Sequence, residues 1–324
     1  MTSLKRLLAL FLIFSLLPLP SWGWGPEGHI YANQAAARKI PSDMPRFFRK
    51  GAEWITYLSN EPDRWRDARE VSLRNAQAPD HYIDLELLEG MPELPRERYA
   101  FYKMLDEKRA ATPGSADKLL PERVGLQPYI VMEVYERLRA SFREYRERKQ
   151  ENKATKEVKK KIVFYGGWLG HYVADAANPL HTTIHYNGWV GENPKQYTND
   201  PRTHFAFEST YVAANLKAQD FEELVQPPAR LADPWADYMK YLRESNQLVE
   251  EFYRLERTGA FAGAGTPEGH EFTRRRLAAG SQMLVNLWYT AWRESAELPP
   301  VPRPPAPANR PAPTIPLAPP PAPK

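Results

Sequence analysis

A mostly apolar segment occupies residues 162–181 and reads IVFYGGWLGHYVADAANPLH. Its first part, Ile162–Ala177, is rich in small residues and predicts a buried helix. Pro179 lacks a backbone donor and predicts the end of that helix. His171 and Asp175 are four residues apart, so their imidazole and carboxylate share one helix face. The segment therefore predicts a buried helix with ligand-type side chains near its C-terminal end.

Helical spacing of apolar residues recurs along most of the chain, whereas alternating strand patterns are poor. Further helices are expected over Ile30–Ile40, Tyr129–Phe142, His204–Val212 and Gln282–Arg293. Asp200 and Pro201 are the residue types of a helix cap and a first-turn proline, and they precede the third of these. The stretch Arg143–Lys161 mixes both charges and predicts a solvated helix pair or surface protrusion. We expect a single all-α domain over residues 24–298.

The N-terminal residues 1–23 have the pattern of a signal peptide. Lys5 and Arg6 precede the apolar run Leu7–Leu17, which is far shorter than the roughly 20 residues that a membrane span needs. We therefore expect a mature protein that begins at Trp24, has no stable membrane span, and is periplasmic or secreted. An uncleaved anchor is the alternative.

The C-terminal residues 299–324 are half proline, mixed mainly with alanine. This composition predicts a disordered, extended tail without a packed core. A solvated tail is the simplest interpretation. Contact with the cell envelope or with a proline-binding partner is the alternative.

The composition excludes several kinds of site. The 324 residues include no cysteine, which excludes disulfides, thiolate nucleophiles, iron–sulfur clusters and cysteine-bound zinc. Any metal ion must be held by histidine, carboxylate or backbone groups. The net charge is only +4, with 44 Lys and Arg against 40 Asp and Glu, so charge alone does not indicate a nucleic-acid partner.

The histidines and carboxylates show a spacing that suits metal binding. His204 and Glu208 repeat the four-residue spacing of His171 and Asp175. The turn at Pro179 returns the chain toward the helix end just before His181, which is a further candidate ligand. The other candidate ligands are Asp63 and His81. A free amino group and the carbonyl of Trp24 can chelate a metal ion, and His29 follows about one turn later.

In this order of residues the sequence resembles the phospholipase C/nuclease superfamily of three-zinc phosphodiesterases. These comprise the single-strand-specific zinc nucleases of fungi and plants and the zinc-dependent phospholipases C of bacteria. The order is an N-terminal Trp, His, Asp, His, His-x-x-x-Asp, Pro-Leu-His and His-x-x-x-acid, and it is complete here between Trp24 and Glu208. The resemblance implies an all-α, multi-helix domain with a trinuclear zinc cleft.

The resemblance also implies a ligand set for three Zn²⁺ ions. The first ion is expected on Asp63, His81, His171 and Asp175. The second is expected on Trp24, His29 and Asp175, with Asp175 bridging the two. The third is expected on His181, His204 and Glu208.

The implied activity is zinc-dependent hydrolysis of phosphodiester bonds. Zinc lowers the pKa of bound water to about 7, and the expected step is in-line attack by a hydroxide that bridges two ions. Asp63 could orient that hydroxide. Arg66 matches the nucleases' Asp-x-x-Arg and could bind a phosphate. Tyr82 and Asp84 stand where the nucleases offer an aromatic platform for a base and an acid that binds it.

The substrate remains open at this point. The main expectation is a single-strand-preferring endonuclease that releases 5′-nucleotides, because the N-terminal motif, Arg66, Tyr82 and Asp84 resemble the nucleases. A zinc-dependent phospholipase C or another phosphoesterase is the alternative, because Glu208 is the phospholipase type of ligand, Ser209 replaces an expected Asn, and disulfides are lacking. A non-catalytic, zinc-binding envelope protein is the third possibility.

Overall fold

The computed structural model describes residues 24–67, 69–91 and 93–297. This part of the chain is helical and contains no strand, only an isolated bridge between Ile83 and Gly125. The predicted all-α fold is thereby confirmed. The predicted signal peptide (1–23) and proline-rich tail (299–324) lie outside the described residues.

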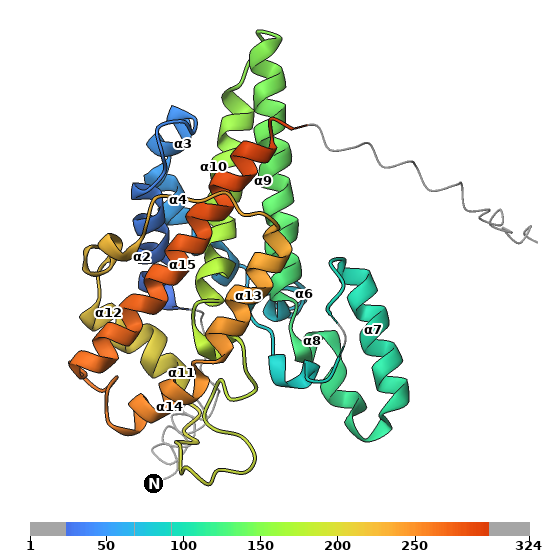
Figure 1. The fold of residues 1–324 in the computed structure, drawn as a ribbon, viewed down its shortest axis with the longest axis vertical. Helices are drawn as coiled ribbons and strands as arrows, with labels where there is room; N and C mark the ends of the chain where they lie inside the picture. The colour runs from blue at the N-terminus through green and yellow to red at the C-terminus, as the bar shows by residue number, and fades with distance from the viewer. Residues whose placement is uncertain (1–23, 68, 92, 298–324) are drawn as a thin grey trace, which may run out of the picture.

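The helices follow the chain in a fixed order, with short 3₁₀ segments between the longer elements (Figure 1). The α-helices are α2 (Gly25–Arg38), α3 (Arg46–Lys50), α4 (Ala52–Leu58), α5 (Glu61–Arg64), α6 (Val71–Gln77), α7 (Arg98–Ala111), α8 (Pro121–Val124), α9 (Gln127–Gln150), α10 (Lys156–Asp175), α11 (Thr203–Phe205), α12 (Val212–Asn215), α13 (Pro234–Asn246), α14 (Val249–Arg257) and α15 (Pro267–Glu294). The 3₁₀ helices are η1 (Ala78–His81), η2 (Leu85–Leu88), η3 (Pro113–Leu119), η4 (Pro179–His181), η6 (Ala218–Asp220) and η7 (Glu222–Leu224), and η5 (Ala206–Tyr211) is a π-helix. Among the described helices, none combines the length and the apolar character that a membrane crossing requires.

Helix α10 lies at the centre of the bundle and packs against α2, α4, α9 and α15 (Figure 1). Its glycines allow this close approach. A Cβ atom at Gly167 would lie 2.6 Å from the Cβ of Leu58 and 2.8 Å from the carbonyl of Ile55. On another side, the indole of Trp288 in α15 donates a hydrogen bond to the carbonyl of Gly166 at 3.1 Å. The small residues of the apolar segment thus bring α10 into direct contact with its neighbours.

Helices α9 and α10 continue beyond the bundle as an antiparallel pair, which forms the upper end of the molecule in Figure 1. The connection turns at Asn152, which has a φ of 53°. Glu144 on α9 forms ion pairs with Arg148 on the same helix and with Lys161 on α10. The solvated helix pair expected over Arg143–Lys161 is therefore present.

Two predicted helices are shorter than the observed ones. The expected helix Gln282–Arg293 is only the C-terminal part of α15, which begins at Pro267 after the Thr266 cap. Gly269 and Gly280 interrupt the apolar pattern, so the sequence hides the first half. Similarly, α10 begins at Lys156, whereas the prediction began it at Ile162. The apolar pattern misses the first turns because they are solvated and carry charged side chains.

The expected cap at Asp200 and Pro201 is wrong in detail. The helix begins at Thr203, and the Asp200 carboxylate accepts the Arg202 amide at 2.9 Å in a preceding turn. The helix then widens into the π-helix η5 before it ends at Asn215. Single-turn π segments occur frequently at functional sites. The sequence pattern does not predict this one.

Candidate metal centre

Eight predicted ligand side chains meet at one buried place between helices from distant parts of the chain. Four of them, in chain order, are His29 (α2), Asp63 (α5), His81 (η1) and His171 (α10). The others are Asp175 (α10), His181 (η4), His204 (α11) and Glu208 (η5). All eight are buried, and the ligand atoms fall into three groups that could each hold a metal ion.

Asp175 lies at the centre of these groups. Its Oδ2 is 3.1 Å from Nδ1 of His81 and 3.4 Å from Nε2 of His171. Its Oδ1 is 3.4 Å from Nε2 of His29 and 3.8 Å from Nε2 of His181. Two ligands of one tetrahedral zinc ion at its usual bond lengths are separated by about 3.3 Å. The two oxygens therefore face different pairs of imidazoles at separations that suit shared metal coordination.

Asp63 and His29 form a further group with His171. Asp63 Oδ1 lies 3.8 Å from Nε2 of His171 and 3.9 Å from Nδ1 of His81. The rings of His29 and His171 stack with centroids 3.9 Å apart. The structure groups His29 with Asp63 and His171, whereas the sequence assigned it to Asp175 and the N-terminus. His29 is within reach of both carboxylates.

The third group is the one expected from the sequence: His181, His204 and Glu208. Glu208 Oε2 lies 2.6 Å from Nε2 of His204 and 3.4 Å from Nε2 of His181. Because Glu208 is on the π-helix, its turn is wider than an α-helical one. Asn178, which the sequence did not single out, donates a hydrogen bond to Glu208 Oε2 at 3.3 Å.

Hydrogen bonds outside the groups fix the orientation of two imidazoles. His171 Nδ1 lies 2.7 Å from the Ser59 carbonyl, and His181 Nδ1 lies 2.7 Å from the His81 carbonyl. A ring nitrogen that donates to a carbonyl leaves the other nitrogen free to bind a metal ion. In both residues the free atom is Nε2, which faces the carboxylates.

Burial strongly disfavours charge at this centre. It raises the pKa of Asp63 to about 7, although Arg66 nearby opposes the shift, and it raises the pKa of Glu208 to about 7. The pKa of Asp175 is raised well above its usual value by burial and by the neighbouring carboxylates. Burial lowers the pKa of His29, as it does for the other imidazoles of the first two groups. Without a cation, the carboxylates tend to hold protons and the imidazoles tend to stay neutral.

The centre also contains many buried polar atoms without a hydrogen-bond partner. They include both ring nitrogens of His29 and of His204, both carboxylate oxygens of Asp63, Oδ1 of Asp175 and Oε1 of Glu208. Buried polar groups in folded proteins are nearly always bonded. Neutral imidazoles and carboxylates are the donor set of zinc sites, so divalent metal ions fit these residues.

Trp24 is fully buried beside the C-terminal end of α10. Its indole donates a hydrogen bond to the Ala174 carbonyl at 2.6 Å, and its own carbonyl accepts the Gly28 amide at 3.1 Å. The residue thus lies next to Asp175 in the chain's packing, as its predicted role requires. Whether its amino group binds metal depends on cleavage before Trp24, which remains a prediction.

A cavity of about 630 Å³ opens beside the centre and contains the predicted substrate residues. It is lined by His81, His181 and His204 of the centre and by Arg66, Tyr82, Asp84, Leu87, Lys118, Glu122, Arg123, Ile184, Tyr186 and Val190, among others. Arg66 Nη1 lies 3.5 Å from Asp63 Oδ1, at the boundary between the cavity and the centre. The Tyr82 hydroxyl donates to the Glu122 carbonyl at 2.7 Å.

Asp84 is buried in this wall, and its Oδ1 has no hydrogen-bond partner. Burial, with Glu86 nearby, raises the pKa of Asp84 to about 8. The structure therefore brings Arg66, Tyr82 and Asp84 together in one cavity. The sequence analysis missed Lys118, Arg123 and Tyr186 because only folding brings them to this cavity. It also missed Asn178, although an Asn before Pro179 is a typical helix-capping residue and its side chain accepts the Leu180 amide.

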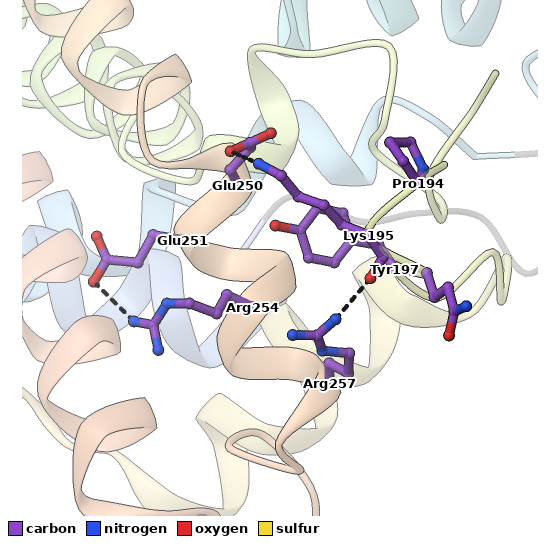
Figure 2. A pocket seen from close by; sticks show the side chains of 8 residues that line it. Pro194, Lys195, Tyr197, Glu250, Glu251, Arg254 and Arg257 are labelled. Atoms are coloured by element: carbon purple, nitrogen blue, oxygen red, sulfur yellow. Dashed lines mark hydrogen bonds and ion pairs between the residues drawn. The ribbon is translucent and has the colours of Figure 1, made fainter. Parts of the chain in front are cut away.

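A second cavity, of about 670 Å³, lies between α14 and the segment before α11 (Figure 2). Its charged side chains are engaged with one another or with the backbone. Lys195 pairs with Glu250 at 2.6 Å, Arg254 with Glu251 at 3.9 Å, and Arg257 donates to the Lys195 carbonyl at 2.6 Å. This cavity contains none of the metal-ligand groups found in the described residues.

No protein-family model matches the sequence, and a search of curated proteins finds no match. Among solved structures, the chain is similar to the alpha-toxin of Clostridium perfringens isolated from avian strain SWCP. That match has 14% identity and a TM-score of 0.40, and it covers 86% of this chain and 67% of the other. The alpha toxin of Clostridium absonum is similar at 13% identity, with a TM-score of 0.38 and coverages of 86% and 68%. At these values the likeness assigns neither a family nor a function.

Proposed function

We propose that this chain is a zinc-dependent hydrolase of phosphodiester bonds. The observation that carries the proposal is the set of three buried imidazole and carboxylate groups, joined through Asp175, at the wall of an open cavity. Their donor types suit zinc, and their atoms are otherwise left without partners. A purely structural metal site would not need an open cavity lined by three of its imidazoles, those of His81, His181 and His204.

The residues of the chain have separable roles in this proposal. His29, Asp63, His81, His171, Asp175, His181, His204 and Glu208, with the amino terminus at Trp24, would hold three zinc ions. When bound, zinc supplies Lewis acidity and water with a pKa near 7. Arg66 is placed to bind a phosphate oxygen, since its guanidinium reaches both Asp63 and the cavity.

Phospholipid is the first candidate substrate. Leu87, Ile184 and Val190 form an apolar part of the cavity wall. Val190 is 54% exposed and Tyr186 is 43% exposed, so the mouth offers apolar surface to a ligand with acyl chains. Phospholipid is thus favoured over the nucleic acid that the sequence motifs first suggested.

Single-stranded nucleic acid is the second candidate. Lys118 and Arg123 are exposed cations at the same cavity and can bind successive phosphates. Tyr82 and Asp84 lie beside them, as the predicted base site requires. The Tyr82 hydroxyl is already bonded to Glu122, however, so only its ring is free to contact a base.

The test uses the mature protein beginning at Trp24, loaded with zinc. Hydrolysis of bis(p-nitrophenyl) phosphate, phosphatidylcholine and single-stranded DNA is measured in parallel. We expect the first two substrates to be cleaved, and cleavage to stop when the metal is chelated. Cleavage of single-stranded DNA without cleavage of phosphatidylcholine would make nucleic acid the first candidate substrate. A zinc-loaded protein that cleaves none of the three would contradict the proposal.

Replacing Arg66 separates substrate binding from metal binding in the same assay. Arg66→Ala should lower hydrolysis strongly while the bound zinc stays the same. Arg64→Ala is the matched control, because Arg64 is exposed at the end of α5, two residues before Arg66, and pairs with Glu61 instead. Equal loss in both variants would show that Arg66 has no special role.

A further inference from the structure

One end of the molecule carries a dense group of cations. Helix α3 contributes Arg46, Arg49 and Lys50, and the segment 143–161 at the end of the α9–α10 pair contains nine Lys and Arg against four Glu. The two parts are in contact: the rings of Phe47 and Tyr145 lie 4.9 Å apart. We call α3 together with residues 143–161 the basic pole.

The acidic residues of the basic pole are mostly engaged, whereas several cations are free. Glu144, Glu151 and Glu157 each form an ion pair with a neighbouring Lys or Arg. Four exposed cations form no ion pair with an acidic residue among the described residues: Arg46, Lys50, Lys149 and Lys156. Because the whole chain has a net charge of only +4, the basic pole is a strong local excess.

The chain leaves the described structure at the same end. The hydroxyl of Ser295, just after α15, accepts a hydrogen bond from Arg146 of the basic pole at 2.8 Å. The following residues 298–324 include Arg303, Arg310 and Lys324 and no acidic residue. These residues therefore carry three positive charges and no negative one.

The basic pole and the metal centre lie at opposite ends of α10 (Figure 1). Lys156 begins this 20-residue helix and Asp175 ends it, a separation of about 30 Å along the axis. Lys156 is thus too far away to bind a phosphate positioned at the metal centre. The function of the cations at this end of the helix pair is then separate from the reaction.

The aromatic residues of the basic pole indicate which anion fits. The guanidinium of Arg146 covers the ring of Trp292 at 3.3 Å, and Lys159 lies 5.7 Å from the ring of Phe47. Binding of single-stranded nucleic acid relies on open aromatic faces for base stacking. Here cations cover those faces while other cations are free, which favours a ligand that presents phosphates without bases.

We propose that the basic pole docks the protein onto a bilayer that contains anionic phospholipids. Groups of four to eight Lys and Arg bind such surfaces, each contributing roughly equally through charge. Docking at this end turns the metal cavity away from the bound surface, toward solution or a facing membrane. The inference does not depend on the proposed function, because it uses none of the metal-centre residues.

The test is co-sedimentation of the mature, full-length protein with phosphatidylcholine vesicles, with and without phosphatidylglycerol. Released phosphocholine is measured in the same tubes, so that hydrolysis is distinguished from binding. We expect binding only to the anionic vesicles, with a strong decrease at high salt. Equal binding to both vesicle types, or to neither, would overturn the proposal.

Charge reversal locates the binding surface. Lys149→Glu with Lys156→Glu should weaken binding at least about tenfold, given the contribution of each cation. Lys103→Glu with Lys240→Glu is the matched control, because both residues are exposed and lie on α7 and α13, outside the basic pole. Circular dichroism checks that both variants fold. Equal weakening in the two would contradict the proposal. The proposal would also be contradicted if the protein bound a single-stranded oligonucleotide through Lys149 and Lys156 and did not bind the anionic vesicles.

Discussion

Asp175 shows how one residue can organise a whole site. Its two oxygens face four imidazoles at 3.1–3.8 Å, and these come from α2, η1, α10 and η4. Burial raises its pKa well above the usual value, so the carboxylate form needs a cation beside it. The same burial that disfavours the bare carboxylate would favour a divalent cation bound beside it.

Asp84 should make the metal-free protein less stable as the pH rises from about 4 to about 8. Burial raises the pKa of Asp84 to about 8, against about 3.9 in an unfolded chain. The folded state therefore holds the proton more tightly, and this stabilisation is complete below about pH 4 and is lost as the pH rises through 8. Asp84→Asn keeps a neutral side chain at every pH.

We therefore expect the melting temperature of Asp84→Asn to exceed that of the parent protein by an amount that grows between pH 5 and pH 9. Both proteins are chelated beforehand, and melting is followed by circular dichroism. Glu86 is the charged neighbour that adds to the shift, so Glu86→Gln should reduce the difference. A difference that is constant with pH would show that Asp84 is already ionised.

Asn178 should act through Glu208. Its amide donates to Glu208 at 3.3 Å, and its oxygen accepts the Leu180 amide, which fixes the turn that leads to His181. Loss of such outer contacts typically lowers metal affinity by about 10–100-fold. Asn178→Ala should therefore weaken binding of one zinc ion and leave two unchanged, measured by competition with a chelating dye. Asn215→Ala, which removes a distant amide bonded to Tyr211 and Gly263, should leave all three unchanged.

At the scale of elements, α10 combines structure and site in one helix. Its glycines allow α4 to approach, and its C-terminal turn carries two ligands. Gly167→Ala would place a methyl group 2.8 Å from the Ile55 carbonyl, so we expect a loss of stability of about 1–3 kcal/mol. Denaturant unfolding measures it. Gly114→Ala meets no atom within 4 Å and should be nearly neutral. Equal effects of the two substitutions would show that the helix contact is not tight.

The elements also show what the sequence could predict and where it could not. The apolar spacing around His171 and near Tyr129 identified α10 and α9, because buried helices repeat with a clear period. The first half of α15 was missed, since Gly269 and Gly280 break that period while tertiary packing maintains the helix. The π-helix at Glu208 was missed because its extra residue per turn leaves no pattern in the sequence.

For the whole molecule, the eight side chains nominated as ligands from the sequence lie together in the structure, while the ion that each would hold stays a prediction. The three ligands of the third group share a short stretch of chain and were grouped as the structure has them. His29 was assigned to Asp175, from which it lies 3.4 Å, and only the fold reveals that it also stacks on His171 in a group with Asp63. The cavity wall from Lys118 to Val190 could not be predicted, since its residues meet only after folding.

The N-terminus gives a prediction at this scale. If export cleaves the chain before Trp24, the new amino group lies at the metal centre, next to the end of α10. Adding one glycine before Trp24 should then lower bound zinc by about one ion, since it removes that ligand. Adding the same residue after Lys324 is the control. Metal analysis of both proteins decides the point, and unchanged zinc in the first would exclude Trp24 as a ligand.

The central claim, that the buried groups around Asp175 hold zinc for phosphodiester hydrolysis, is tested most directly by one measurement. Hydrolysis of bis(p-nitrophenyl) phosphate is followed in the zinc-loaded protein, after chelation, and after zinc is restored, with His171→Ala beside it. We predict activity that disappears and returns with zinc, and a variant that binds less zinc and remains inactive. Activity that persists after chelation, or a fully active His171→Ala protein, would contradict the claim.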